Sequence, residues 1–398
     1  MKMRAVTAFA TLSLTLTGCS AGLAPDAQFA PPPPEITLVT PQAHDPAELQ
    51  VLFWNETQRS ARFRAMEQWF AGLEVPPAIT PRELPVGTPL SARDAKAIEH
   101  LMSETNAVGV MILQDGQKRF ESYRDGFGPD QRWTSFSVAK SITSTLLGAA
   151  LHDGFIASLD DTVPTYVPEL TNSAYHDVTL RQLVQMTSGV AWNEDYTDPA
   201  SDVAQMNRFI LEHGLQAIVA QMGTLKREAE PGIKWLYKTG ETNLLGLVVE
   251  NAVGLPLAQY AQSRIVRQAG FANGLFWMVD PRGGNIGGCC LSLALGDYAR
   301  MGQFVLEGGQ SSVADGWFAE ATIPAPPVAE DTPVSYGYQW WIYPEINAFG
   351  AQGIFGQGII ILPERQMVVA MLGNWPTGSN SGYRQKWRDL AASIEATP

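Results

Sequence analysis

The chain has 398 residues, of which 45% are hydrophobic and 17% charged, with 36 glycines and 27 prolines. This composition is typical of a globular protein and excludes a largely disordered chain, a collagen and a coiled coil. The net charge of −13, with 27 basic and 40 acidic side chains, argues against binding to nucleic acid. Three cysteines cannot build a disulfide scaffold, and no two of the five histidines have His-x-x-x-His spacing, so we expect neither a metal nor a cofactor.

The first eighteen residues have the pattern of a secretory signal. Lys2 and Arg4 precede an apolar stretch, Ala5 to Thr17, which is shorter than the about 20 residues that a membrane-spanning helix needs. The stretch ends in Leu16-Thr17-Gly18-Cys19, which resembles a bacterial lipobox, whose cysteine is acylated. The alternative is an ordinary signal peptide that is followed by a chance cysteine.

These features predict how the chain is divided and where it resides. We expect a lipoprotein signal peptide over 1–18, a membrane anchor on the lipidated Cys19 and a Pro-rich tether over 19–47. A single folded domain would then cover 48–398, with a mainly helical lobe at about 150–285. The expected location is the outer membrane, facing the periplasm.

Two early elements are predicted from local patterns. Residues 92–104 have the pattern of a helix. Residues 108–113 and 118–123 flank Asp115-Gly116, which is typical of a β-hairpin.

The residues with the clearest chemistry lie at 131–154. Apolar side chains recur at helical spacing from Val138 to Ala150, and Gly154 is a good helix terminator, so Ser137 would stand at the first turn of a mostly buried helix. Lys140 follows three residues later and shares a helix face with Ser137. Burial lowers the pKa of a lysine and makes it a proton acceptor, which would activate the serine for covalent acyl transfer. The alternative is a solvated serine beside a lysine that extends to water.

Other hydrolase mechanisms have little support. The chain has no Gly-x-Ser-x-Gly motif, and no histidine follows His213, whereas a Ser-His-Asp site in the α/β-hydrolase order needs a late histidine. An amine base is therefore the natural alternative.

A resemblance to a known family is carried by two stretches, SFSVAKSITSTLLGAALHDGFIASLDDTVPTYVPEL and VTLRQLVQMTSGV. They resemble the serine β-lactamase and penicillin-binding-protein superfamily, and most of all its class C-like branch, which includes esterases and 6-aminohexanoate-dimer hydrolases. The first family motif falls on Ser137 and Lys140. The second, a tyrosine about a hundred residues later, falls on Tyr237 in WLYKTGETNLLG.

The third family motif departs from the β-lactamase pattern. Lys238-Thr239-Gly240 spells the motif but lies directly after Tyr237, so the positional match is instead FGAQGIFGQGIIILPERQMVVAMLGN. That run resembles the esterase and amide-hydrolase branch. It lacks the lysine that holds the carboxylate of β-lactam antibiotics, which argues against a penicillinase or a peptidoglycan carboxypeptidase.

The resemblance implies a mechanism and an oxyanion site. Ser137 would attack a carbonyl with Lys140 and Tyr237 as a coupled base pair, and Tyr237 would relay a proton to the leaving group. The backbone N–H groups of Ser137 and Ile354 would bind the oxyanion.

Candidate substrate contacts lie on two further segments. The loop 191–203 carries Trp192 and Tyr196, and a similar loop closes over the substrate in the nylon-oligomer hydrolase branch, so both are candidates, with packing on the helical lobe as the alternative. Gln357 would either line the site or mark a bulge. The aromatic residues from Tyr336 to Tyr343, Trp341 among them, are assigned to the core. Cys289 and Cys290 are adjacent, and two free thiols are the expected state rather than a vicinal disulfide.

The implied fold is α/β (α+β): a β-lactamase/DD-peptidase-like antiparallel sheet flanked by helices, with a mainly helical lobe. The expected function is hydrolysis of small-molecule esters or linear amides through an acyl-enzyme. Two alternatives remain: a β-lactamase or D-Ala-D-Ala carboxypeptidase, and a catalytically silent lipoprotein binding module.

Overall fold

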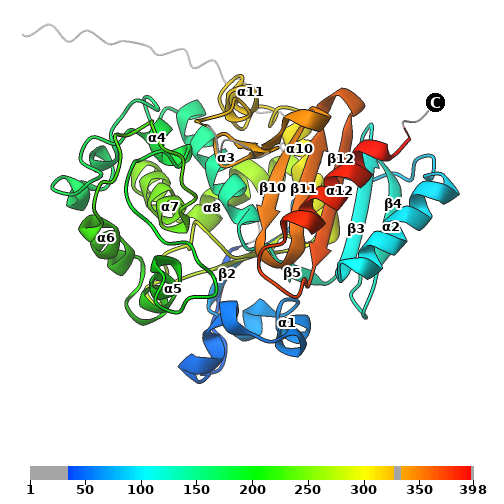
Figure 1. Ribbon diagram of the computed structural model, residues 1–398, viewed down its shortest axis with the longest axis horizontal. Coiled ribbons are helices and arrows are strands. Elements are labelled where there is room, and N and C mark those ends of the chain that lie inside the picture. The colour runs from blue at the N-terminus through cyan, green and yellow to red at the C-terminus, as the bar shows by residue number, and fades with distance from the viewer. Residues whose placement is uncertain (1–34, 327–332, 396–398) are drawn as a thin grey trace, which may run out of the picture. The chain divides into compact units, whose positions relative to one another are not determined.

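The computed structural model describes residues 35–326 and 333–395, and its main element is a seven-stranded antiparallel sheet (Figure 1). The strand order is β4-β3-β12-β11-β10-β9-β8, so the predicted hairpin is present as β3 and β4, and it lies beside the C-terminal strands. The strands of this sheet are β3 (Ala107–Gln114), β4 (Gln117–Tyr123), β8 (Ser335–Tyr336), β9 (Trp341–Tyr343), β10 (Ala348–Gly353), β11 (Gln357–Leu362) and β12 (Met367–Gly373).

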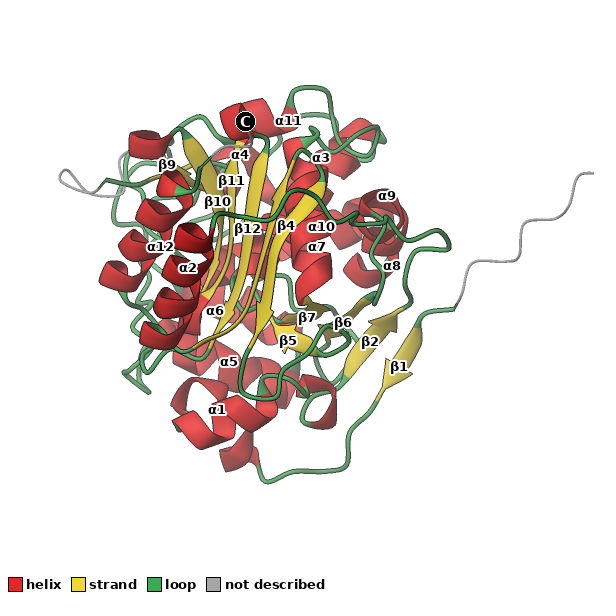
Figure 2. Ribbon diagram, turned by 90° about the vertical axis from the view of Figure 1, so that its right-hand side faces the viewer, coloured by secondary structure: helices red, strands yellow, loops and turns green. Residues whose placement is uncertain are grey.

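Both faces of this sheet are covered by helices. Along β3, Met111 and Leu113 belong to one core cluster, whereas Val110 and Ile112 belong to the other, because successive side chains of a strand point to opposite faces. Helices α2 (Ala92–Glu104) and α12 (Ser381–Ser393) lie on one face, and α3 (Val138–His152) and α10 (Leu295–Leu306) lie on the other (Figure 2). The sheet is therefore the middle layer of three, and the predicted helix at 92–104 is confirmed.

A second, five-stranded antiparallel sheet has the order β1-β2-β6-β7-β5. Its strands are β1 (Thr37–Val39), β2 (Gly72–Val75), β5 (Arg132–Thr134), β6 (Leu275–Met278) and β7 (Leu291–Ala294). Because β1 pairs with β2, residues 37–39 belong to the folded unit, which corrects the far end of the tether predicted over 19–47. The signal peptide predicted over 1–18, Cys19 and the proline run lie outside the described residues.

Helices are the main regular structure of the segment that was predicted as a helical lobe, about 150–285, but turns and loops connect them and the segment also supplies strand β6. Before it, α1 (Glu56–Arg62) lies beside two short 3-10 helices, η1 (Pro46–Leu49) and η2 (Val51–Phe53). No single helix of the described residues is long and apolar enough to cross a membrane. The helical segments Thr239–Val253 and Leu257–Ala269 would be long and apolar enough if taken together, but they are bent by 74° relative to one another. The remaining helices are α3 (Val138–His152), α4 (Leu180–Val184), α5 (Asp202–His213), α6 (Leu215–Thr224), α7 (Thr239–Val253), α8 (Leu257–Ala261), α9 (Arg267–Ala269), α10 (Leu295–Leu306) and α11 (Trp317–Ala321).

A buried ion pair supports the beginning of α7. Lys238 Nζ lies 3.2 Å from Glu241 Oε1, and both side chains have no exposed area. The same carboxylate accepts a hydrogen bond from Tyr175 at 3.2 Å, and Lys238 also donates to Ser188 at 3.1 Å. Lys238, the first residue of the Lys-Thr-Gly sequence at 238–240, is therefore engaged in a buried ion pair and points away from solvent.

Removal of one member of this pair is expected to destabilise the protein more than removal of both. Lys238→Met leaves a buried carboxylate without its cation, which costs about 3–5 kcal/mol in the free energy of unfolding. The double variant Lys238→Met/Glu241→Leu removes both charges and is expected to lose less. Urea unfolding of the wild type, both single variants and the double variant measures this, and additive losses would contradict the assignment.

Candidate active site

Ser137 stands at the N-terminus of α3, directly after the turn that leaves β5. Its backbone is near-helical, with φ −71° and ψ −2°, and its side chain does not cap the helix. The preceding residue, Phe136, has φ 42°, a left-handed conformation that costs a non-glycine residue about 1–3 kcal/mol. Its ring is held between Phe63 and Phe355, at centroid distances of 5.0 and 5.4 Å. The packing of this ring therefore fixes a strained turn next to the serine.

Lys140 lies one helical turn further on, as predicted, and its amine meets the serine. Lys140 Nζ is 3.1 Å from Ser137 Oγ and donates a hydrogen bond of 2.7 Å to the backbone carbonyl of Gly288. The side chain is only 1% exposed. Burial lowers the pKa of Lys140 from 10.5 to about 8, and the negative charge of Glu194 partly opposes this shift. The amine is therefore far easier to deprotonate than that of a solvated lysine, which excludes the alternative of a lysine extended to water.

The carbonyl that holds Lys140 belongs to a closely packed pair of glycines. The Gly288 N–H donates to the side-chain oxygen of Asn243 on α7 at 2.8 Å. A Cβ added to Gly288 would lie 2.9 Å from the carbonyl oxygen of Thr239, so a larger residue would separate this turn from α7. Gly287 accepts a hydrogen bond of 2.7 Å from Thr143 on α3. The backbone between α3 and α7 is thus locked where it meets the amine.

Tyr237 lies just before α7, on the other side of Lys140. The Lys140 amine is 5.2 Å from the centroid of the Tyr237 ring. Burial and the charge of Glu194 raise the pKa of Tyr237, while a hydrogen bond with Ser137 and the charge of Arg384 lower it. The ring stacks on Trp341 at 5.8 Å with an interplanar angle of 25°. The structure therefore brings Ser137, Lys140 and Tyr237 together.

The end of β10 packs tightly against the turn before Ser137. A Cβ added to Gly353 would lie 2.3 Å from the carbonyl oxygen of Ser135, so only glycine fits there. Ile354 follows it in the short helix η8 (Ile354–Gly356) and lines the same two pockets as Ser137. The two residues predicted to supply the oxyanion N–H groups are therefore neighbours in space.

Glu194 organises the loop 191–203, and the sequence analysis did not single it out. One carboxylate oxygen accepts a hydrogen bond of 2.9 Å from the Tyr196 hydroxyl, and the other accepts one of 2.9 Å from the Thr239 N–H. Trp192 Nε1 and the Thr239 hydroxyl also donate to it. Tyr196 lines both of the pockets that contain Ser137. Trp192 is 8% exposed and lines neither pocket, so it packs in the protein and is not a substrate contact.

Gln357 also has a structural role instead of the expected place in the site. Its side chain has no exposed area, and its amide donates to the Ile354 carbonyl at 2.9 Å. Its side-chain oxygen accepts from the Gly373 N–H at 2.9 Å. Gln357 therefore bridges the η8 turn and β12, and it lines neither of the two pockets that contain Ser137.

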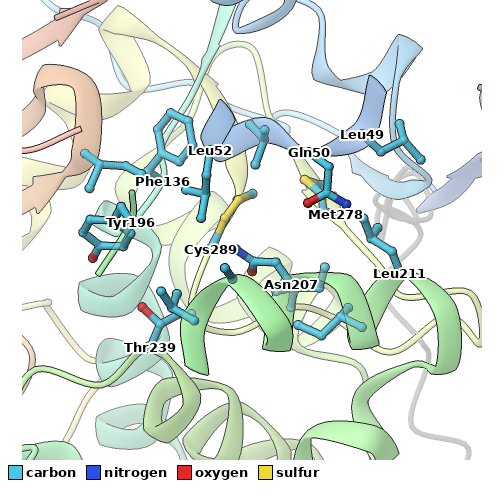
Figure 3. Close-up of a pocket in the computed structure, with 18 of the residues that line it drawn as sticks. Leu49, Gln50, Leu52, Phe136, Tyr196, Asn207, Leu211, Thr239, Met278 and Cys289 are labelled. Atoms are coloured by element: carbon cyan, nitrogen blue, oxygen red, sulfur yellow. A yellow bond between two sulfur atoms is a disulfide. The ribbon is translucent and has the colours of Figure 1, made fainter. Parts of the chain in front are cut away.

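Two pockets of opposite character meet at Ser137. The first encloses about 780 Å³ between its lining atoms, part of it open to solvent, and runs from Tyr196 and Thr239 towards Leu211 and Met278 (Figure 3). The second encloses about 1380 Å³, also partly open, and we call it the polar pocket because charged side chains are part of its lining. Its lining includes Glu194, Tyr237, Trp341, Arg384 and Arg388. Trp341 was assigned to the core by the sequence analysis, but its ring faces this second pocket.

Arg384, on α12, is the unpaired cation of the polar pocket. Its guanidinium donates to the carbonyl of Gln357 at 2.9 Å and to that of Gly353, and it lies 4.6 Å from the centroid of Trp375. It forms no ion pair with a carboxylate in the part of the chain that the structure describes. Burial lowers the pKa of Arg384 to about 10. No local pattern around Arg384 indicates a role in the site, because α12 approaches the site only through the tertiary fold.

A disulfide joins Cys289 and Cys290 at the wall of the first pocket (Figure 3). This differs from the expected pair of free thiols. Among the described residues, no group of three or more His, Cys, Asp or Glu side chains is arranged to hold a metal ion.

Residues 95–393 match the Beta-lactamase family, and the chain belongs to this family. The fold and the family define a serine hydrolase. A 6-aminohexanoate-dimer hydrolase of Paenarthrobacter ureafaciens is 28% identical over 333 residues, which cover 79% of this chain and 83% of that protein.

Solved structures confirm the β-lactamase/DD-peptidase-like fold. A putative 6-aminohexanoate-dimer hydrolase from Bacillus anthracis matches with a TM-score of 0.75 and 22% identity, covering 88% of this chain and 98% of that chain. EstCE1, a hydrolase with promiscuous acyltransferase activity, matches with a TM-score of 0.61 and 15% identity, covering 76% and 100%. A class C β-lactamase matches with a TM-score of 0.57 and 17% identity, covering 77% and 96%.

The lowered pKa of Lys140 can be tested by NMR on protein labelled with ¹³Cε-lysine, with Lys140→Arg to assign the signal. The Lys140 signal is expected to titrate near pH 8, as its buried environment requires. Because the Glu194 carboxylate stabilises the ammonium form, Glu194→Gln is expected to lower this pKa further. Substitution of the exposed Glu212 by Gln serves as the control and is expected to leave it unchanged. Titration near 10.5, or an upward shift in Glu194→Gln, would contradict this account.

Proposed function

We propose that the protein hydrolyses carboxylic esters and linear amides through an acyl-enzyme on Ser137. The observation that carries this proposal is the amine of Lys140, buried and easily deprotonated, 3.1 Å from the hydroxyl of Ser137. A serine with such a base beside it is the arrangement required for nucleophilic acyl transfer. A binding module without catalysis has no use for a costly buried amine at this place, which argues against the silent alternative.

In the proposed acylation step, Ser137 Oγ attacks the carbonyl carbon while its proton passes to the neutral amine of Lys140. The N–H groups of Ser137 and Ile354 then stabilise the negative oxygen of the tetrahedral intermediate. Tyr237 is suited to relay the proton to the leaving nitrogen or oxygen, because its raised pKa keeps the phenol protonated until that moment. The carbonyl carbon–leaving group bond breaks, and the amine or alcohol departs.

Deacylation repeats the sequence with water in place of the serine. Water attacks the acyl carbon, its proton passes to the Lys140–Tyr237 pair, and Ser137 regains its hydrogen as the carboxylic acid leaves. Since Lys140 must be neutral to accept a proton, turnover is expected to rise as the pH increases through about 8.

Hydrolysis of β-lactams or D-alanyl peptides is the second candidate, and Arg384 favours it. These substrates carry a carboxylate on the leaving side, and Arg384 is a cation without a carboxylate partner in the pocket that contains Tyr237. Against it, the η8 turn carries no lysine at the third motif.

A fluorophosphonate probe tests the nucleophile. We expect covalent labelling of Ser137, located by peptide mapping and abolished in Ser137→Ala. Heat-denatured protein, in which the site is lost, is expected to remain unlabelled. Labelling at another residue, or persistence in Ser137→Ala, would reject the proposal. Rates on p-nitrophenyl acetate, 6-aminohexanoate dimer and nitrocefin then rank the substrates, and fast nitrocefin turnover would favour the second candidate.

Gly353→Ala tests the oxyanion site. The added Cβ would displace β10 from the Ser135 carbonyl and move the Ile354 N–H, so kcat/KM on an ester is expected to fall by about 10²-fold, the usual effect of losing one oxyanion donor. Gly128→Ala is the matched control, because an added Cβ there meets no atom within 4 Å. Unchanged kcat/KM in Gly353→Ala would remove Ile354 from the mechanism.

A further inference from the structure

The two pockets at Ser137 can be assigned to the two sides of the scissile bond. Ser137, Tyr196 and Ile354 line both of them, so the carbonyl under attack lies at their junction. Only the polar pocket contains Tyr237, the group suited to protonate the leaving atom. The leaving group therefore occupies the polar pocket, and the acyl group extends into the first pocket.

The first pocket is lined predominantly by apolar side chains. Its lining contains no charged side chain; the polar ones include Gln50, Asn207 and Thr239. Apolar side chains come from α5, from the strand β6 and from the segment around η2. Figure 3 shows Leu49, Leu211 and Met278 at the end away from Tyr196.

One wall of this pocket is a feature of the N-terminal part of the chain. Residues 49–53 line it, although they precede the segment 95–393 that matches the family. They are held in place because the Trp54 indole donates to the Glu48 carbonyl at 2.7 Å and Arg62 donates to the same carbonyl at 3.1 Å. The acyl side of the site therefore depends on a segment that the family match does not include.

We propose that the substrate is an ester or amide of an aliphatic acid whose far end is uncharged. This inference rests on the proposed function and specifies its acyl side. Each methylene that is moved from water into an apolar pocket is worth about fourfold in kcat/KM. An ammonium at the far end would instead lose its hydration without meeting a carboxylate in the lining, and burial of an unpaired charge is strongly unfavourable.

The proposed acyl group differs from the one in 6-aminohexanoate dimer, the substrate in the name of the Paenarthrobacter relative. A 6-aminohexanoyl group ends in an ammonium, whereas a heptanoyl group has the same length and ends in a methyl. The lining described above favours the methyl. Gln50 and Asn207 offer amide dipoles to an ammonium but no compensating charge.

Matched p-nitrophenyl esters test the acyl side on the wild-type protein. We expect kcat/KM to rise from acetyl to hexanoyl, and to be at least about 10²-fold higher for heptanoyl than for 6-aminohexanoyl, after division by the rates of hydroxide hydrolysis. Equal or better hydrolysis of the acetyl ester, or of the 6-aminohexanoyl ester, would overturn the proposal.

A carboxylate introduced into the first pocket tests whether the acyl chain lies there, because it should shift the preference from the heptanoyl towards the 6-aminohexanoyl ester. Ala204, on α5, is 6% exposed and lines the pocket, so Ala204→Asp would offer an ammonium its missing partner. The ratio of kcat/KM for the 6-aminohexanoyl and heptanoyl esters is expected to rise at least about tenfold in Ala204→Asp over Ala204→Asn, which has the same size without the charge. Equal ratios in the two variants would place the acyl chain elsewhere.

The outcomes distinguish this inference from the proposed function. If Ser137 is labelled and p-nitrophenyl acetate is hydrolysed, but neither acyl preference appears, the hydrolase mechanism stands and the acyl assignment fails. If Ser137 is not labelled, both fail.

Discussion

The site depends on a single costly arrangement, a lysine amine kept out of water beside a serine hydroxyl. Desolvation of an ammonium is unfavourable, so the fold has to hold Lys140 in place and leave it one good acceptor, the Gly288 carbonyl. The packing around it serves this purpose: α3 carries the lysine, α7 carries Asn243, and the two glycines at 287 and 288 let the backbone pass between these helices. The strain at Phe136 is held by the same core.

Parts of this arrangement follow from local sequence, because they depend on neighbours within one helix. Ser137 and Lys140 are three residues apart on a buried helix, and this spacing alone brings their side chains together. The hairpin β3–β4 and helix α2 were likewise predictable from turn residues and periodicity. Tyr237 required the family resemblance, since nothing in its own neighbourhood indicates that it approaches a serine a hundred residues earlier.

The remaining residues of the site come together only in the tertiary fold. Arg384 lies on the last helix, α12. The Glu194 carboxylate accepts four hydrogen bonds from donors on its own loop and on α7, and these hold the loop in place. Gln357 and Trp192 were taken for substrate contacts because they lie in the right segments, but their side chains turn into the protein and complete its hydrogen bonds. Trp341 shows the reverse case, an aromatic residue in a core-like run whose ring stacks on Tyr237.

The order of the strands in the large sheet also constrains how the protein is made. Strand β3 lies between β4 and β12, yet β12 follows it in the chain by roughly 250 residues. During synthesis, one edge of β3 therefore stays without its partner until roughly 250 further residues have been made. An unsatisfied strand edge invites pairing with other chains, so this edge is the place where nascent copies are most exposed to incorrect pairing before β12 emerges.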